Sequence, residues 1–96
     1  DEEGSNKTNA TEVVANSDFD GSVIQVENYL KYDYLKDPDS YQSIEWSAVQ
    51  KVEKNSKYKY FVRHKYRAKN GFGGYNVEEQ VFFLDPNGNV VDVQGF

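Results

Sequence analysis

His64 is the only histidine of the chain and the side chain best suited to proton transfer, because it titrates near neutrality without perturbation. The apolar pattern of the flanking segments sets it opposite Glu79, and a His–Glu pair can act as an acid/base dyad. The same pair can instead be a semi-buried polar contact that ties two strands together. Because no nucleophile or third partner accompanies the pair, we favour the structural interpretation and predict no catalytic residue.

A glycine-rich stretch and an acidic corner are the other candidates for chemistry. Gly71-Phe72-Gly73-Gly74 is followed by a strand pattern, whereas a phosphate-binding loop leads into a helix. Asp37, Asp39 and Ser40 offer oxygen ligands for calcium, but not at the spacing of an EF-hand. With no cysteine and one histidine, a zinc site built from cysteines or several histidines of one chain is excluded. We therefore predict no metal and no cofactor.

Length and composition narrow the class of protein further. Ninety-six residues make one small domain, and fifteen aromatic side chains (16% of the chain) supply a large buried area. A net charge of −5 argues against nucleic acid as the main ligand. No apolar run approaches the ~18 residues of a membrane-spanning helix. The chain has no methionine, even at position 1, and we expect a mature form from which a signal peptide was removed.

The chain is organised around one β-hairpin. In Tyr58–Ala68, aromatic and β-branched residues alternate with basic ones, a pattern typical of a strand with one solvated face. The second arm is Tyr75–Leu84, and matching the apolar faces of the two arms leaves a six-residue loop, Lys69–Gly74. The resulting register pairs Tyr60 with Phe83, Val62 with Val81, Tyr66 with Val77, and Ala68 with Tyr75.

The segments before the hairpin predict a helix and a further strand. Asp18–Ser22 supplies capping residues for an amphipathic helix of roughly 14 residues that begins near Val23. Asp37-Pro38 ends this helix, because proline cannot continue it. A first strand follows, in which alternate apolar residues point inward: Ile44, Trp46, Ala48 and Val52.

After Leu84, Asp85–Asn89 fits a type I turn that closes on a glycine bulge. It sends Val91 and Val93 to the face of Phe83 and Val81. The predicted fold class is therefore α+β, with one N-terminal helix packed on a four-stranded antiparallel meander. Residues 18–96 form this single domain, and residues 1–17 are predicted to be a disordered tail or tether because they are polar and unpatterned.

Two surfaces are candidates for binding. On the outer face of the sheet, Val49, Phe61 and Phe82 form an apolar row beside a basic stripe, in which Lys65 lies between Glu45 and Glu78. The row predicts a partner-binding or self-association surface, whereas the basic stripe is predicted to be a solvated face with cross-strand charge pairs.

At one end of the sheet, the corner Asp37–Ser40 must approach the loop Lys69–Gly74, because the first two strands are antiparallel. Two interpretations of this end stay open. It is either a structural latch, with Asp39, Ser40 and Asn70 satisfying the loop and Phe72 plugging the core, or a recognition site with Phe72 or Tyr75 exposed. The predicted binding residues are Asp37, Asp39, Ser40, Asn70, Phe72, Tyr75, Phe61 and Phe82.

Two stretches, Leu35–Ser40 (LKDPDS) and Tyr66–Tyr75 (YRAKNGFGGY), resemble a group of small bacterial envelope proteins of unknown function. Those proteins combine an LKDPDS-type helix end with an AKNxFGGY-type hairpin loop, and the likeness spans Val23 to Phe96. Members often carry a cysteine upstream of the second motif, which this chain lacks. The resemblance implies secretion or lipoprotein anchoring in a Bacteroides-like organism, and it supplies no catalytic residues.

Three hypotheses for function follow. The first is a non-enzymatic, extracytoplasmic binding module on an N-terminal tether, with a protein partner or a second copy on the outer sheet face. The second is an inhibitor-like protein that docks its sheet face or hairpin loop onto a secreted enzyme. The third, which we rank last, is a hydrolase that uses His64 and Glu79.

Overall fold

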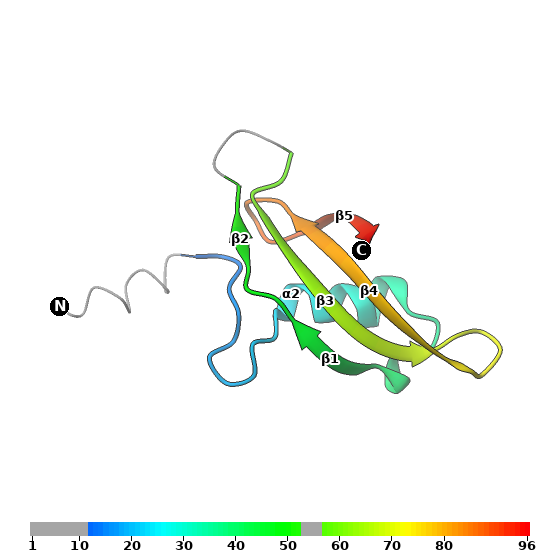
Figure 1. Ribbon diagram of the computed structural model, residues 1–96. Helices are drawn as coiled ribbons and strands as arrows, with labels where there is room; N and C mark the ends of the chain where they lie inside the picture. The colour runs from blue at the N-terminus through cyan, green and yellow to red at the C-terminus, as the bar shows by residue number, and fades with distance from the viewer. Residues whose placement is uncertain (1–11, 53–56) are drawn as a thin grey trace.

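The computed structural model describes residues 12–52 and 57–96, in which one helical segment lies across one face of an antiparallel sheet (Figure 1). The helical elements are α2 (Ile24–Tyr29), the π-helical turn η1 (Leu30–Tyr34) and the 3₁₀ turn η2 (Pro38–Ser40). The strands are β1 (Gln42–Trp46), β2 (Gln50–Lys51), β3 (Tyr60–Lys69), β4 (Tyr75–Leu84) and β5 (Val90–Gly95). None of the helices in these two ranges is long and apolar enough to cross a membrane.

The sheet order is β1-β3-β4-β5, and β2 also pairs with β3. The predicted α+β class with an antiparallel sheet is confirmed, but the sheet has five strands because the predicted first strand is broken into β1 and β2. A register shift between Ser43 and Glu45 leaves Ile44 exposed, contrary to prediction, while Trp46 stays half-buried opposite His64. Such a bulge re-aims the side chains that follow it.

The core lies between the helix and the inner face of the sheet. Along β3, every second residue is buried, which is the period-two pattern that the sequence predicts. The buried apolar residues are Val14, Val23, Val26, Leu30, Tyr60, Val62, Tyr66, Ala68, Phe82 and Leu84. Aromatic side chains therefore supply much of the volume of this small core.

The β3–β4 loop contains five residues, Asn70–Gly74, and not the predicted six. The Asn70 amide donates to the Gly74 carbonyl at 2.8 Å, and Lys69 pairs with Tyr75. Every pair of the two strands is thereby shifted by one residue from the predicted register.

This shift exchanges the two faces of β4, because side chains along a strand alternate with a period of two. Phe82, which we predicted on the outer face, is fully buried, and Phe83 lies outside. The observed pairs include Tyr60 with Leu84, Val62 with Phe82, His64 with Gln80, Tyr66 with Glu78, and Ala68 with Asn76.

The turn Asp85–Asn89 forms as predicted. The Asp85 amide donates to the Asn89 carbonyl, and the Gly88 amide donates to the Asp85 carbonyl, both at 2.9 Å. Gly88 has a φ of +90°, which side chains with a Cβ rarely adopt. Beyond the turn, Val93 lies opposite Phe82 on the inner face, whereas Val91 is exposed. The predicted inward position is therefore wrong for Val91.

The helical segment differs from the prediction at both ends. Its N-cap is Val23, which makes no side-chain capping bond, and the Asp20 carboxylate instead accepts from the Ser22 amide within its own turn, at 3.0 Å. The last turn is π-helical, and the Leu35 amide donates to the Leu30 carbonyl at 2.8 Å. The wider turn stacks Tyr34 on Tyr29 with ring centroids 5.8 Å apart.

The prediction of a disordered tail up to residue 17 is wrong for residues 12–17, and residues 1–11 lie outside the described residues. Val14 is only 2% exposed and belongs to the core. The Asn16 side chain donates to the Ser47 carbonyl (3.0 Å) and accepts from the Val49 amide (2.8 Å). It thus satisfies backbone groups in the gap between β1 and β2.

Val14→Ala should lower the free energy of unfolding by roughly 2 kcal/mol, because it removes buried methyl groups and leaves a cavity. Val13→Ala is the matched control: Val13 is 48% exposed, so its replacement should change the free energy by less than ~0.5 kcal/mol. Urea denaturation of the two variants measures the difference. Equal stabilities would show that this segment is not part of the core.

Candidate binding site at the hairpin end of the sheet

The corner Asp37–Ser40 contacts Lys69, which was predicted as the first residue of the loop and is the last residue of β3. The Ser40 hydroxyl accepts from the Lys69 amide at 2.8 Å and donates to the Asp37 carbonyl at 2.6 Å. Ser40 is buried. It therefore acts as a latch between two segments that lie about thirty residues apart in the sequence.

Asn70 holds the loop in one conformation. Its side-chain carbonyl accepts from the amides of Phe72 (2.8 Å) and Gly74 (3.2 Å), and its NH₂ group donates to the Asn76 side chain at 3.3 Å. Gly73 has a φ of +88°, which the turn requires. The loop thus satisfies several of its own backbone groups, so the role of Asn70 is structural.

Phe72 does not plug the core. Its side chain is 99% exposed, on a loop that projects beyond the rest of the sheet (Figure 1). The latch interpretation is therefore correct for Ser40 and Asn70 but wrong for Phe72.

Beside the loop, Tyr75 lies on the outer face of the sheet. The Arg67 guanidinium is 3.9 Å from its ring centroid, and the Lys69 ammonium is 5.8 Å from it. Tyr75 is 42% exposed, and Val77, which we predicted to face inward, is 59% exposed on the same face. We call Arg67, Tyr75 and Val77 the basic–aromatic patch.

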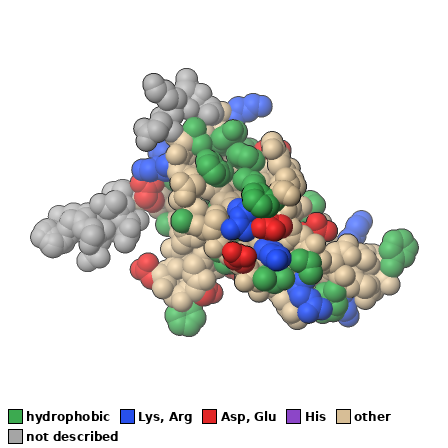
Figure 2. Space-filling view, viewed as in Figure 1, with side chains coloured by type: hydrophobic (Ala, Val, Ile, Leu, Met, Phe, Trp, Pro, Cys, Tyr) green, Lys and Arg blue, Asp and Glu red, His purple; other side chains and the backbone are tan. Residues whose placement is uncertain are grey.

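The middle of the outer face is charged. Arg63 pairs with Glu79 at 2.5 Å and lies 3.6 Å from Glu45. Lys65 lies opposite Glu45 and Glu79, so the predicted alternating row exists with Glu79 in place of Glu78. Figure 2 shows basic and acidic side chains gathered between two groups of hydrophobic side chains on this face. Such partly exposed pairs contribute little stability.

The predicted outer apolar row is only partly present. Phe61 is half-buried, and its ring centroid lies 6.0 Å from that of Phe83. The ring centroids of Phe83 and Tyr58 lie 4.6 Å apart. Phe82 does not belong to this row, because it is buried in the core. Phe83, and not Phe82, lies opposite Phe61 on the outer face.

The two acidic residues of the corner have different surroundings. Asp37 contributes its backbone carbonyl to the latch, whereas Asp39 is exposed and lines a shallow hollow with Lys31 and Tyr41. Among the described residues, no group of three or more histidine, aspartate or glutamate side chains is placed to hold a metal ion.

The His64–Glu79 pair does not form. His64 faces Gln80 on the inner face, and Glu79 pairs with Arg63 on the outer face. Trp46, which we predicted to point inward, stacks its ring on His64 with centroids 3.4 Å apart. The geometry on which the hydrolase hypothesis depends is therefore absent.

Both ring nitrogens of the buried His64 have partners. Nδ1 lies 2.9 Å from the Glu45 carbonyl, which can only accept, so Nδ1 carries the proton. Nε2 then accepts from the Tyr41 hydroxyl at 2.7 Å. Burial lowers the pKa of His64 from its usual 6.5 to about 4, so the ring is neutral at neutral pH.

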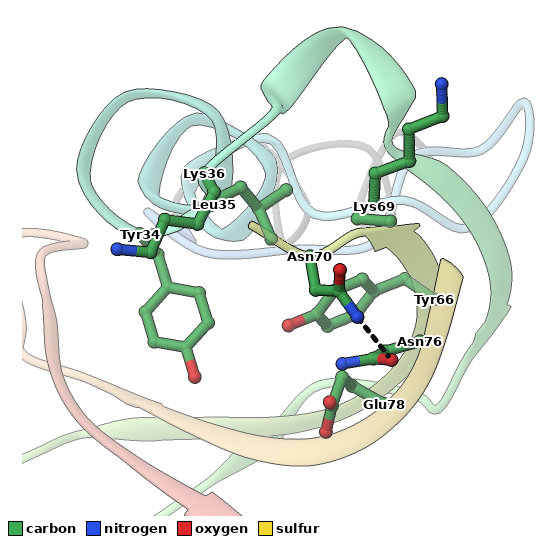
Figure 3. A pocket seen from close by; sticks show the side chains of 9 residues that line it. Tyr34, Leu35, Lys36, Tyr66, Lys69, Asn70, Asn76 and Glu78 are labelled. Atoms are coloured by element: carbon green, nitrogen blue, oxygen red, sulfur yellow. Dashed lines mark hydrogen bonds between the residues drawn. The ribbon is translucent and has the colours of Figure 1, made fainter. Parts of the chain in front are cut away.

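A cavity of about 340 Å³ opens on the inner side of the same end of the sheet (Figure 3). Tyr34, Asn76 and Glu78 line it, together with Asn70. We did not predict the first three as site residues. The predicted register placed Asn76 and Glu78 on the outer face, and a five-residue loop would have placed them on the inner face. Tyr34 lies in the π-helical turn, which was not predicted.

No family model matches the chain, and no curated protein or solved structure is significantly similar to it.

Ser40→Ala should destabilise the protein by about 1–2 kcal/mol, because it leaves the part-buried Lys69 amide without its acceptor. Phe72→Ala should change the free energy of unfolding by less than ~0.5 kcal/mol, because the side chain is in solvent. Thermal and urea unfolding of both variants measure this contrast. A loss of about 3 kcal/mol in Phe72→Ala would restore the plug interpretation.

Stability should fall between pH 6.5 and pH 4, because the unfolded chain then binds a proton at His64 that the folded chain does not. The loss is up to about 3 kcal/mol, and stability is fully retained above pH 6.5. Urea denaturation at several pH values measures the slope, and His64→Gln should remove most of it. An unchanged slope in His64→Gln would show that His64 is not its source. Carboxylates such as Asp85, whose pKa is lowered by the Asn89 amide, act below this pH range, because the unfolded chain binds their protons only near pH 4 and below.

Proposed function

We propose that this chain is a non-enzymatic binding module that recognises a protein partner with the tip of the β3–β4 hairpin. The observation that carries the proposal is Phe72, which is fully exposed at the end of a loop that Asn70 holds in place. A large aromatic side chain on a preorganised loop can bind without a large loss of loop entropy. Aromatic anchors of this kind dominate the binding energy of many interfaces.

The basic–aromatic patch supports the same assignment. Arg67 stacks on Tyr75 at 3.9 Å, and Val77 is exposed beside them. Tyrosine and arginine are enriched in protein–protein interfaces, whereas surface lysine and glutamate are depleted. Phe72 lies in the loop that leads directly into β4, where Tyr75 and Val77 of the patch begin the strand, so one partner can contact both.

The proposed location is outside the cytoplasm, as a secreted protein or a lipoprotein. The support for it is the likeness of the LKDPDS and YRAKNGFGGY stretches to small bacterial envelope proteins.

An inhibitor of a secreted enzyme is the second candidate. The projecting loop favours it, because a convex tip with one aromatic side chain can enter the concave active site of an enzyme. In that case the captured partner is an enzyme, and stoichiometric addition of this chain lowers its activity.

Affinity capture from a bacterial envelope extract tests the proposal with three immobilised full-length chains. Wild type and Phe19→Ala should retain the same partner, whereas Phe72→Ala should retain it at least tenfold less. Phe19 is the matched control, because it is 95% exposed but lies in the turn before α2.

Circular dichroism and melting curves of the three chains establish that they are equally folded. Equal capture by Phe72→Ala and wild type would contradict the proposal, as would an equal loss in Phe19→Ala.

A further inference from the structure

The cavity at the hairpin end is apolar on one side and polar on the other. Leu35 contributes apolar surface, with little added by the nearly buried Tyr66 and Ala68, while Asn76 and Glu78 contribute polar groups. Figure 3 shows Leu35, Asn76 and Glu78, together with Tyr34, around one space. Its volume of about 340 Å³ is at the lower end of the range for ligand pockets, so it suits one side chain or a small molecule.

Hydrogen bonds orient the polar wall. The Tyr66 hydroxyl donates to the Gln80 side-chain carbonyl (2.8 Å), and the Gln80 amide donates to the Tyr34 hydroxyl (3.2 Å). The Asn76 side-chain carbonyl accepts from Asn70, which leaves its NH₂ group directed at the cavity, near the Glu78 carboxylate (Figure 3).

Glu78 is the acidic residue that lines the cavity. Burial, followed by the neighbouring Tyr34 and the Glu78 carboxylate, raises the pKa of Tyr66, so its hydroxyl stays protonated and uncharged. Two lysines also contribute to the lining, but their ammonium groups are directed elsewhere. The Lys69 ammonium lies 5.8 Å from the Tyr75 ring on the outer face, and Figure 3 shows the Lys36 ammonium directed away from Asn76 and Glu78.

We propose that this cavity binds a guanidinium or alkylammonium group, with Glu78 as the counter-ion and the exposed ring of Tyr34 as its aromatic wall. A carboxylate that accepts charge-assisted hydrogen bonds and aromatic faces that attract cations are the usual features of such sites. The apolar side of the cavity would contact the aliphatic part of the ligand. Phe72 is not part of this site, so a failed test of the cavity does not contradict the function proposed for the loop, and a failed test of the loop does not contradict the cavity site.

NMR titration of the full ¹⁵N-labelled chain tests the proposal. The probe is N-acetyl-arginine N-methylamide, and the matched control is the citrulline analogue, which has nearly the same shape and no charge. We expect saturable shifts in the backbone amides of Tyr34 and Glu78 and in the side-chain amide of Asn76. The citrulline analogue should bind at least tenfold more weakly. Equal affinities, or the absence of saturable shifts at these residues, would overturn the proposal.

Two variants one residue apart add a second test. Glu78→Gln should weaken binding of the arginine probe at least tenfold, whereas Glu79→Gln should change it less than twofold because Glu79 lies on the other face. The opposite ranking would refute the site.

Agmatine and an acetyl-Gly-Arg-Gly-amide peptide then separate the two sources of the cation. Tighter binding of agmatine identifies a free amine metabolite as the ligand, and tighter binding of the peptide identifies a basic side chain of a partner. Failure of both to bind would contradict the proposal.

Discussion

The closure of the β3–β4 loop by Asn70 is the constraint on which the rest of the structure depends. The hydrogen bond from the Asn70 amide to the Gly74 carbonyl ends the ladder after the Lys69–Tyr75 pair. Because successive side chains of β4 point to opposite faces, the position of this hydrogen bond decides which of them face the helix. It places Asn76 and Glu78 in the cavity, and Tyr75 and Val77 on the outer face. Both proposed binding regions follow from it.

A second constraint is the need to satisfy polar groups around a thin core. The gap between β1 and β2 exposes backbone groups that Asn16 satisfies, and Val14 then fills space beside the sheet. On the inner face, His64 is tolerated because the Glu45 carbonyl and Tyr41 hydroxyl occupy its nitrogens. Buried polar groups cost little when they are paired in this way.

The sequence predicted the structure correctly wherever a single pattern of residue types was compatible with only one arrangement. Alternation in β3 predicted its buried face, and the Asp85–Asn89 residues predicted the turn that they form. Antiparallel pairing of the first two strands predicted that Ser40 lies beside Lys69. The register of β4 was not predictable from hydrophobicity, because apolar residues occur on both of its faces. Placing Val81 and Phe83 on the inner face gives the predicted register, and placing Phe82 and Leu84 there gives the observed one.

Other features were missed because they have no local signal. A single buried valine in a polar stretch has no periodicity, so the docking of residues 12–17 could not be read from the sequence. The π-helical turn has no sequence signal of its own, and it places Tyr34 beside Tyr29 and within hydrogen-bond distance of Gln80 on β4.

The register of β3 against β4 is the most direct test of this account. Cross-strand Hα–Hα and amide–amide NOEs join directly opposite residues of antiparallel strands, so an NMR spectrum of the full chain reads the pairing without any mutation. We predict that these NOEs join Val62 with Phe82 and Lys69 with Tyr75. NOEs that join Val62 with Val81 and Ala68 with Tyr75 would contradict the account, because they would turn Glu78 away from the cavity and Tyr75 toward the core.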